Sequence, residues 1–168
     1  MKRIVMMAVS VILALTMATP MVLAQGQGGA PGDAGFTLEI KPGDFPGTCD
    51  FPVLLETSGK GKAIELPAKK KGVAEAFIFT SPGLDATLTN VNNPENQATY
   101  NITGTVTQTT LENGNVETVL TGRNLAIDPE AGFVIAIGNF SFVFDAEGNL
   151  VQPLTGEGQL IDVCEALA

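Results

Sequence analysis

Short runs in which apolar and polar residues alternate, separated by turn-forming residues, repeat from residue 36 to the end of the chain. An alternation of period two is typical of β-strands with one buried face. After the first 24 residues no window shows the 3.6-residue apolar period of a capped helix, and at most one helical turn is expected in DVCEALA. The pattern therefore predicts an all-β protein. The expected strands are 36–40, 51–57, 62–67, 74–80, 84–91, 98–111, 116–122, 133–137, 140–145, 150–154 and 158–163.

Segments rich in glycine, asparagine and proline mark the connections between these strands. ENGN (112–115) and AEGN (146–149) each stand between two strand runs and predict β-hairpin turns. TSPGLD (80–85), TGRN (121–124) and TGEGQ (155–159) are also interpreted as turns. Because short turns join sequential strands, and sequential strands tend to pair, we expect an antiparallel barrel with largely meander connections. A β-sandwich is the alternative.

Phenylalanines recur with period two in two of the expected strands. Phe140, Phe142 and Phe144 share one face of their run, and Phe77 shares a face with Phe79. Since phenylalanine is usually buried, these stripes predict core positions more readily than a ligand pocket.

The first 24 residues differ from the rest of the chain. Lys2 and Arg3 precede an apolar run that ends in small residues at VLA (22–24). These are the parts of a secretory signal peptide, and the apolar run is shorter than the about 20 residues that span a bilayer. An uncleaved membrane anchor is the alternative. We expect a signal-peptide helix at 1–24, a flexible, disordered glycine-rich leader at 25–35 and a single all-β domain at 36–168.

Cleavage after Ala24 changes the charge of the chain. It removes 24 of 168 residues and two of nine basic residues, which leaves 144 residues, about one domain, with 7 bases against 18 acids and a net charge of −11. An acidic surface of this kind repels nucleic acid and anionic lipid headgroups. We therefore expect a secreted, extracellular protein with no membrane span after cleavage and no nucleic-acid partner. Solubility explains the charge most simply, and cation binding is the alternative.

The chain has two cysteines, Cys49 and Cys164. Because an exported chain meets an oxidising environment, they are expected to form a disulfide bond. The bond would close a loop of more than a hundred residues and would stabilise the fold by restricting the unfolded chain. Two free thiols are the alternative, but a catalytic thiol normally requires a histidine base, and the chain has no histidine.

The missing residue types exclude much familiar chemistry. Without histidine there is no Ser-His-Asp or Cys-His nucleophile and no imidazole metal ligand. With the cysteines paired there is no thiolate zinc site, and neither phosphate-binding glycine motif occurs in the chain. We expect no catalytic residue, no cofactor and no bound metal.

A few weak signals remain for carboxylate or cation chemistry. Asp128 with Glu130 and Asp145 with Glu147 are close in sequence, as a glycosidase pair requires, but both pairs fall at expected turns, where acids are ordinarily solvated. DAEGN at 145–149 resembles only the start of a calcium loop. The lysines of KKKG are interpreted as a solvated loop rather than a polyanion site.

Arg123 is the strongest single candidate for a ligand contact. It is the only basic residue after Gly72, among twelve acids, and is expected at the end of a strand. An ion pair with a neighbouring carboxylate is the simpler interpretation. The functional interpretation is an anion or ligand contact at a barrel mouth. Asn101 and Asn139 also begin glycosylation acceptor triplets, a pattern that arises often by chance.

The second half of the chain resembles a group of small secreted proteins of actinobacteria. The shared order is Gly104, the hairpin at ENGN, TGRN, glycine-bounded hydrophobic strands, DAEGN and the ending TGEGQLIDVCEALA. These proteins have a signal peptide, an early cysteine and a terminal D-x-C-x-x-L segment, which Asp162, Cys164 and Leu167 match here, with Cys49 as the early cysteine. The resemblance covers about two thirds of the chain after cleavage. It implies architecture and export, and it carries over no functional site.

Three functional hypotheses follow from these observations. The first is a secreted, non-enzymatic β-barrel that acts as a binding or cell-envelope interaction module for a protein or small-molecule partner. The second is a lipocalin-like carrier of a small apolar ligand, suggested by the phenylalanine-rich strands. The third is a hydrolase or isomerase that uses carboxylates alone, which would require two buried acids in one cleft.

Overall fold

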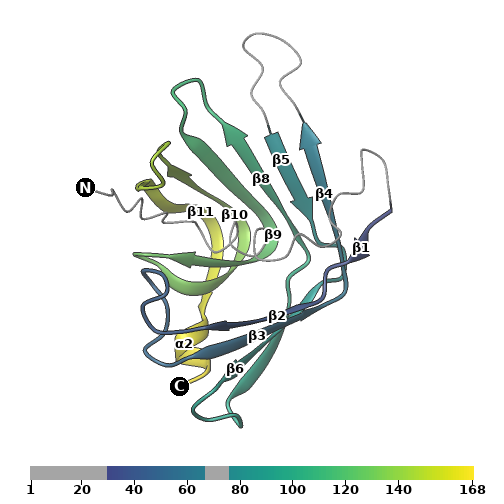
Figure 1. The fold of residues 1–168 in the computed structure, drawn as a ribbon, viewed down its shortest axis with the longest axis vertical. Helices are drawn as coiled ribbons and strands as arrows, with labels where there is room; N and C mark the ends of the chain where they lie inside the picture. The colour runs from purple at the N-terminus through teal and green to yellow at the C-terminus, as the bar shows by residue number, and fades with distance from the viewer. Residues whose placement is uncertain (1–29, 67–75) are drawn as a thin grey trace, which may run out of the picture.

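In the part of the chain that the structure describes, the protein folds into two antiparallel β-sheets and one short helix (Figure 1). The structure, a computed structural model, describes residues 30–66 and 76–168. The described elements are β1 (Gly32–Asp33), β2 (Phe36–Ile40), β3 (Val53–Ser58), β4 (Lys60–Leu66), β5 (Ala76–Thr80), β6 (Asp85–Asn90), β7 (Gln97–Asn101), β8 (Gly104–Thr110), β9 (Val116–Asp128), β10 (Gly132–Phe144), β11 (Leu150–Asp162) and α2 (Val163–Ala166).

Within the described residues neither sheet closes on itself, so the prediction of a closed barrel is wrong and the sandwich-like alternative fits. Seven strands form one sheet in the order β1-β4-β5-β8-β9-β10-β11, and four form the other in the order β2-β3-β6-β7. The expected meander holds only from β8 to β11. Before it, the chain alternates between the sheets: β2–β3 and β6–β7 pair in one, and β4–β5 pairs in the other. Short turns therefore determine which strands form hairpins. Because the chain passes from one sheet to the other between hairpins, the strands form two separate sheets.

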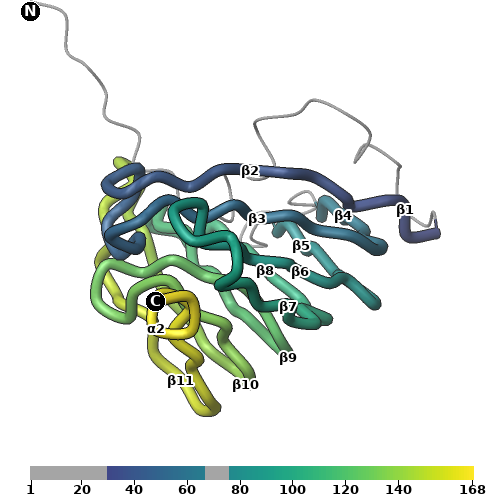
Figure 2. Tube along the Cα trace, turned by 90° about the horizontal axis from the view of Figure 1, so that it is seen from below, coloured from purple at the N-terminus to yellow at the C-terminus, as the bar shows by residue number. Residues whose placement is uncertain are grey.

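The larger hydrophobic core lies between the four-stranded sheet and one part of the seven-stranded sheet. Leu55 and Leu88 enter it from the four-stranded sheet, and Phe133 and Ile135 enter it from β10. Alternate residues of β3 are buried, as the period-two pattern predicts, whereas the last three residues of β6 are all buried. Viewed from below, β8 to β11 fan out beside the four-stranded sheet, and α2 lies where β11 ends (Figure 2).

Strands β9, β10 and β11 are each 13 residues long and strongly bent (Figure 1). Four glycines lie side by side across β8 to β11, two of them at the middle of β9 and β10: Gly104 pairs with Gly122, Gly122 with Gly138, and Gly138 with Gly158. We call these four residues the glycine row. A Cβ on Gly138 would lie only 2.8 Å from the Cα of Gly158, so the strands approach here backbone to backbone.

Two of the expected turns are wrong, because they contain glycines of the glycine row and lie inside strands. TGRN lies inside β9 and TGEGQ lies inside β11, whereas TSPGLD is a turn as expected. Glycine in such a stretch ordinarily indicates a break between strands, but here it allows a long strand to bend while its pairing continues. As a result the expected strands 133–137 and 140–145 are one strand, β10.

The bend folds the seven-stranded sheet over a second hydrophobic core. Phe140, Phe142 and Leu120 line it from one side of the glycine row, and Ala126 and Val134 from the other. The phenylalanine stripe of β10 is therefore core, as the sequence predicts.

The two predicted hairpin turns are confirmed. In the turn at ENGN, the Leu111 N–H donates to the Asn115 carbonyl at 2.7 Å, and in the turn at AEGN the Asp145 N–H donates to the Asn149 carbonyl at 2.9 Å. The single helical turn expected near the C-terminus is also present as α2.

At the N-terminus, pairing begins within the segment expected as leader, because Gly32 and Asp33 of β1 pair with Gly61 and Lys60 of β4. The expected signal peptide and the lysines of KKKG lie outside the described residues. Among the helices that the structure describes, none is long and apolar enough to cross a membrane.

Candidate functional site

Asp128, half of the first carboxylate pair, ends β9 and is buried, with 4% of its surface exposed. Its Oδ1 accepts hydrogen bonds from the backbone N–H groups of Glu130 at 2.9 Å and Ala131 at 2.8 Å. Its Oδ2 accepts one from the N–H of Leu154, in β11, at 3.0 Å. Glu130 is exposed. The pair thus does not converge in a cleft: Asp128 closes the turn after β9 and ties it across the bent sheet to β11.

Replacing Asp128 with asparagine is expected to lower the free energy of unfolding by about 1–3 kcal/mol. The amide keeps one acceptor oxygen for the turn but presents an NH2 group to the N–H of Leu154, so that one buried donor loses its acceptor. Urea denaturation of the variant measures the change. Glu130→Gln removes the same charge from an exposed neighbour and is expected to leave the free energy unchanged, and equal stabilities of the two variants would contradict this role for Asp128.

Asp145, of the second carboxylate pair, organises the hairpin turn between β10 and β11. Its Oδ1 accepts from the N–H groups of Glu147 at 3.0 Å and Asn149 at 2.8 Å, and its Oδ2 accepts from the Asn149 side-chain amide at 2.9 Å. These hydrogen bonds, with that of the Asn149 side chain first, hold the pKa of Asp145 below its usual value. The segment DAEGN therefore forms a hairpin turn that the hydrogen bonds of the Asp145 carboxylate stabilise.

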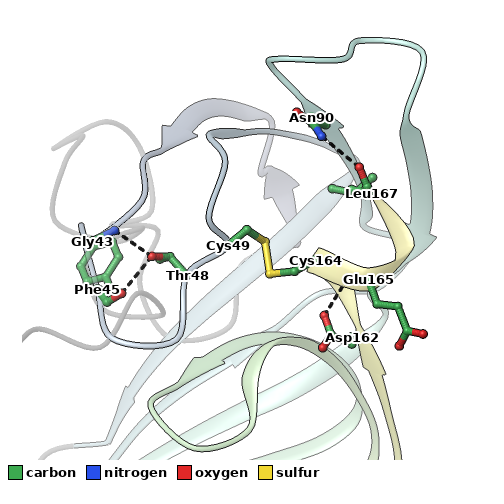
Figure 3. The surroundings of a disulfide bond; sticks show 9 residues. All are labelled: Gly43, Phe45, Thr48, Cys49, Asn90, Asp162, Cys164, Glu165 and Leu167. Atoms are coloured by element: carbon green, nitrogen blue, oxygen red, sulfur yellow. Dashed lines mark hydrogen bonds between the residues drawn. A yellow bond between two sulfur atoms is a disulfide. The ribbon is translucent and has the colours of Figure 1, made fainter.

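The predicted disulfide is present. The Cα atoms of Cys49 and Cys164 are 5.3 Å apart, and the bond joins the segment before β3 to α2 (Figure 3). On the Cys49 side, the Thr48 hydroxyl donates to the Phe45 carbonyl at 3.0 Å and accepts from the Gly43 N–H at 3.1 Å. Cys49 is buried in the larger core. The bond therefore has a structural role, because both cysteines are in the disulfide and neither is a free thiol.

The C-terminal turn is held by three further devices. Asp162 caps α2 by accepting from the Glu165 N–H at 3.0 Å. The side-chain amide of Asn90 donates to the Leu167 carbonyl at 3.0 Å (Figure 3). Val163 and Leu167 are fully buried in the larger core. The C-terminal turn is thus anchored to the larger core and to the four-stranded sheet.

Arg123 lies in the middle of β9 rather than at a strand end, and its side chain is exposed. Because the described strands do not close into a barrel, there is no barrel mouth beside it. The register places it on the face of the sheet that carries Thr105, Thr121 and Asn139: Thr121 pairs with both of the others and lies two residues before Arg123. We call these four residues the Arg123 face.

The two glycosylation triplets lie in different sheets. Asn101, in β7, is exposed, and its side-chain amide donates to Asp85 Oδ1 at 2.9 Å. Asn139 is exposed in the middle of β10 and belongs to the Arg123 face.

Across residues 30–66 and 76–168, no group of three or more cysteine, aspartate or glutamate residues is placed to hold a metal ion. Within the same ranges, every buried side-chain nitrogen or oxygen atom has a hydrogen-bond partner. Comparison of the chain with models of protein families, with curated proteins and with solved structures found no match. The resemblance to actinobacterial secreted proteins therefore stays a prediction.

Proposed function

We propose that the protein is a secreted, non-enzymatic binding module that attaches to a partner in the cell envelope through the Arg123 face. The observation that carries this proposal is the position of Arg123, exposed in the middle of a sheet, with the apolar Ile137 directly opposite it in β10 and the hydroxyl and amide side chains of the Arg123 face beside it. A guanidinium offers five N–H donors in a planar fork that suits a carboxylate or phosphate group. Threonine and asparagine beside it supply hydrogen bonds to neutral parts of the same ligand.

The charge of the chain narrows the class of ligand. Arg123 is the only base after Gly72 in a sequence region with twelve acids. A polyanion is repelled by this surface as a whole, whereas one isolated anionic group is attracted at short range. The favoured ligand is therefore a largely neutral polymer or protein surface that carries separated carboxylate or phosphate groups.

Two features support binding rather than catalysis. Asp128, the buried acid of the first carboxylate pair, already accepts three backbone hydrogen bonds. The buried polar side chains of the described residues likewise find their partners within the fold. The carboxylate-only enzyme and the lipocalin-like carrier are the alternative hypotheses. The carrier was suggested by the phenylalanine-rich strands, and Phe140 and Phe142 of those strands lie in the second hydrophobic core.

Co-sedimentation of the purified protein with the envelope fraction of the cells that export it tests the proposal. We expect Arg123→Ala to bind about ten- to a hundredfold more weakly than the wild type, because one charged hydrogen-bonding group is lost. Lys60→Ala, which removes the same charge from an exposed residue of β4, is the matched control and is expected to bind normally. Equal binding by the wild type and Arg123→Ala, or no binding by the wild type, would overturn the proposal.

A further inference from the structure

Strand β11 is the last strand of the seven-stranded sheet and pairs with β10 alone among the described strands. Its residues 155–160 are all exposed. A long edge strand presents a row of backbone N–H and carbonyl groups that are free to pair with another strand, and proteins usually block or cover such an edge.

The features of β11 that hinder pairing with another strand are concentrated in its first half. Pro153 has no N–H to donate, the register with β10 shifts between Ser141 and Val143, and the N–H of Leu154 is already bonded to Asp128. From Thr155 to Asp162 the pairing with β10 runs without a shift. This second half, which we call the open edge of β11, keeps one pairing register throughout, although Gly156 and Gly158 have φ +157° and +148°.

We infer that the open edge of β11 pairs antiparallel with the open edge of a second copy of the chain, about a two-fold axis at Gly158. In this register Glu157 of one copy lies opposite Gln159 of the other, so a carboxylate faces an amide. Leu160, which is 40% exposed, lies opposite Gly156, whose missing side chain leaves room for it. The edge is therefore complementary to itself.

The charge of the chain selects this register over its neighbours. An axis at Glu157 would place two carboxylates directly opposite each other, which destabilises a strand pair. An axis at Gln159 would place Glu157 against the half-buried, apolar Ile161. Of these three axes, the one at Gly158 gives Glu157 of each copy a polar partner and places Leu160 of each copy opposite a glycine. This inference goes beyond the proposed binding function and does not depend on Arg123.

Sedimentation velocity of the full-length exported protein, over a concentration series up to the millimolar range, tests the inference. We expect a reversible shift from the mass of one chain to the mass of two. Gln159→Lys creates two opposite-charge pairs across the axis and is expected to tighten the dimer about two- to thirtyfold, whereas Gln159→Glu creates two like-charge pairs and is expected to weaken it by a similar factor.

The same two changes at Thr110, an exposed residue at the end of β8, are the matched controls and are expected to leave the dimer unchanged. A single-chain mass at every concentration would overturn the inference. A dimer that responds to neither Gln159 variant would also overturn it, because the copies would then associate through another surface.

Discussion

Replacing both Cys49 and Cys164 with alanine is expected to lower the free energy of unfolding by about 4–5 kcal/mol. The bond joins residues 115 positions apart, so its removal releases a long loop in the unfolded chain. The native fold loses in addition the covalent tie between the segment before β3 and α2. Guanidinium denaturation of the double variant and the wild type, under the same oxidising conditions, measures the difference.

A second measurement separates the crosslink from the cysteine side chains. The wild type unfolded in the presence of a reductant should lose the same free energy as the double alanine variant, because both lack the bond. A double variant as stable as the oxidised wild type would contradict the structural role. Should the double variant fail to fold at all, the reduced wild type still gives the value.

Replacing Gly138 with alanine is expected to lower the free energy of unfolding by about 2–5 kcal/mol, or to prevent folding. Gly138 has φ +138°, a conformation that residues with a side chain rarely adopt, and a Cβ there would overlap the carbonyl oxygen of Glu157. Relief of this overlap would push β11 away from β10 at the centre of the bend. Urea denaturation and thermal unfolding measure the loss.

Two other glycines provide controls for Gly138. A Cβ on Gly32, in β1, would have nothing within 4 Å, and Gly32 has no positive φ, so Gly32→Ala is expected to be nearly neutral. Gly83 has φ +68° but the same open surroundings, so Gly83→Ala reports the conformational cost without the overlap. The expected order of stability is Gly32→Ala, then Gly83→Ala, then Gly138→Ala. If the Gly138 variant were as stable as the Gly83 variant, close packing between the strands would not explain why glycine occupies the positions of the glycine row.

Local patterns in the sequence predict most of the individual elements correctly. The run 36–40 coincides with β2, the turns ENGN and AEGN form hairpins, and the disulfide joins the expected cysteines. These features depend on neighbouring residues or, for the disulfide, on the only possible pairing within the chain. They need no knowledge of how the sheets are arranged.

The arrangement of the sheets could not be predicted in the same way. The expected strand 98–111 is two strands, β7 and β8, which belong to different sheets. Between them, the Ser81 hydroxyl donates to the Ile102 carbonyl at 2.7 Å, and this contact joins residues 21 positions apart. The alternation of side chains continues through both strands, so period alone does not reveal the change of sheet.

The sequence predicts the central residue of the candidate site but not its surroundings. The charge of Arg123 distinguishes it, yet its neighbours on the Arg123 face come from β8 and β10 as well as β9, and only the register brings them together. The expectation of a solvated turn residue at Asp128 is wrong, because its third hydrogen bond comes from Leu154, on another strand. One signal in the sequence does point to the bend: a glycine stands inside each of the three long strands.

The glycine row also limits how the length of this chain can vary. One residue inserted into β9 or β10 between a hairpin and the row would move that strand's glycine out of line and turn its following side chains to the opposite face. The core phenylalanines of β10 would then point toward solvent. Among natural variants of the sequence, insertions and deletions should therefore collect at ENGN and AEGN, while the number of residues separating Gly104, Gly122, Gly138 and Gly158 from their nearest hairpins stays constant.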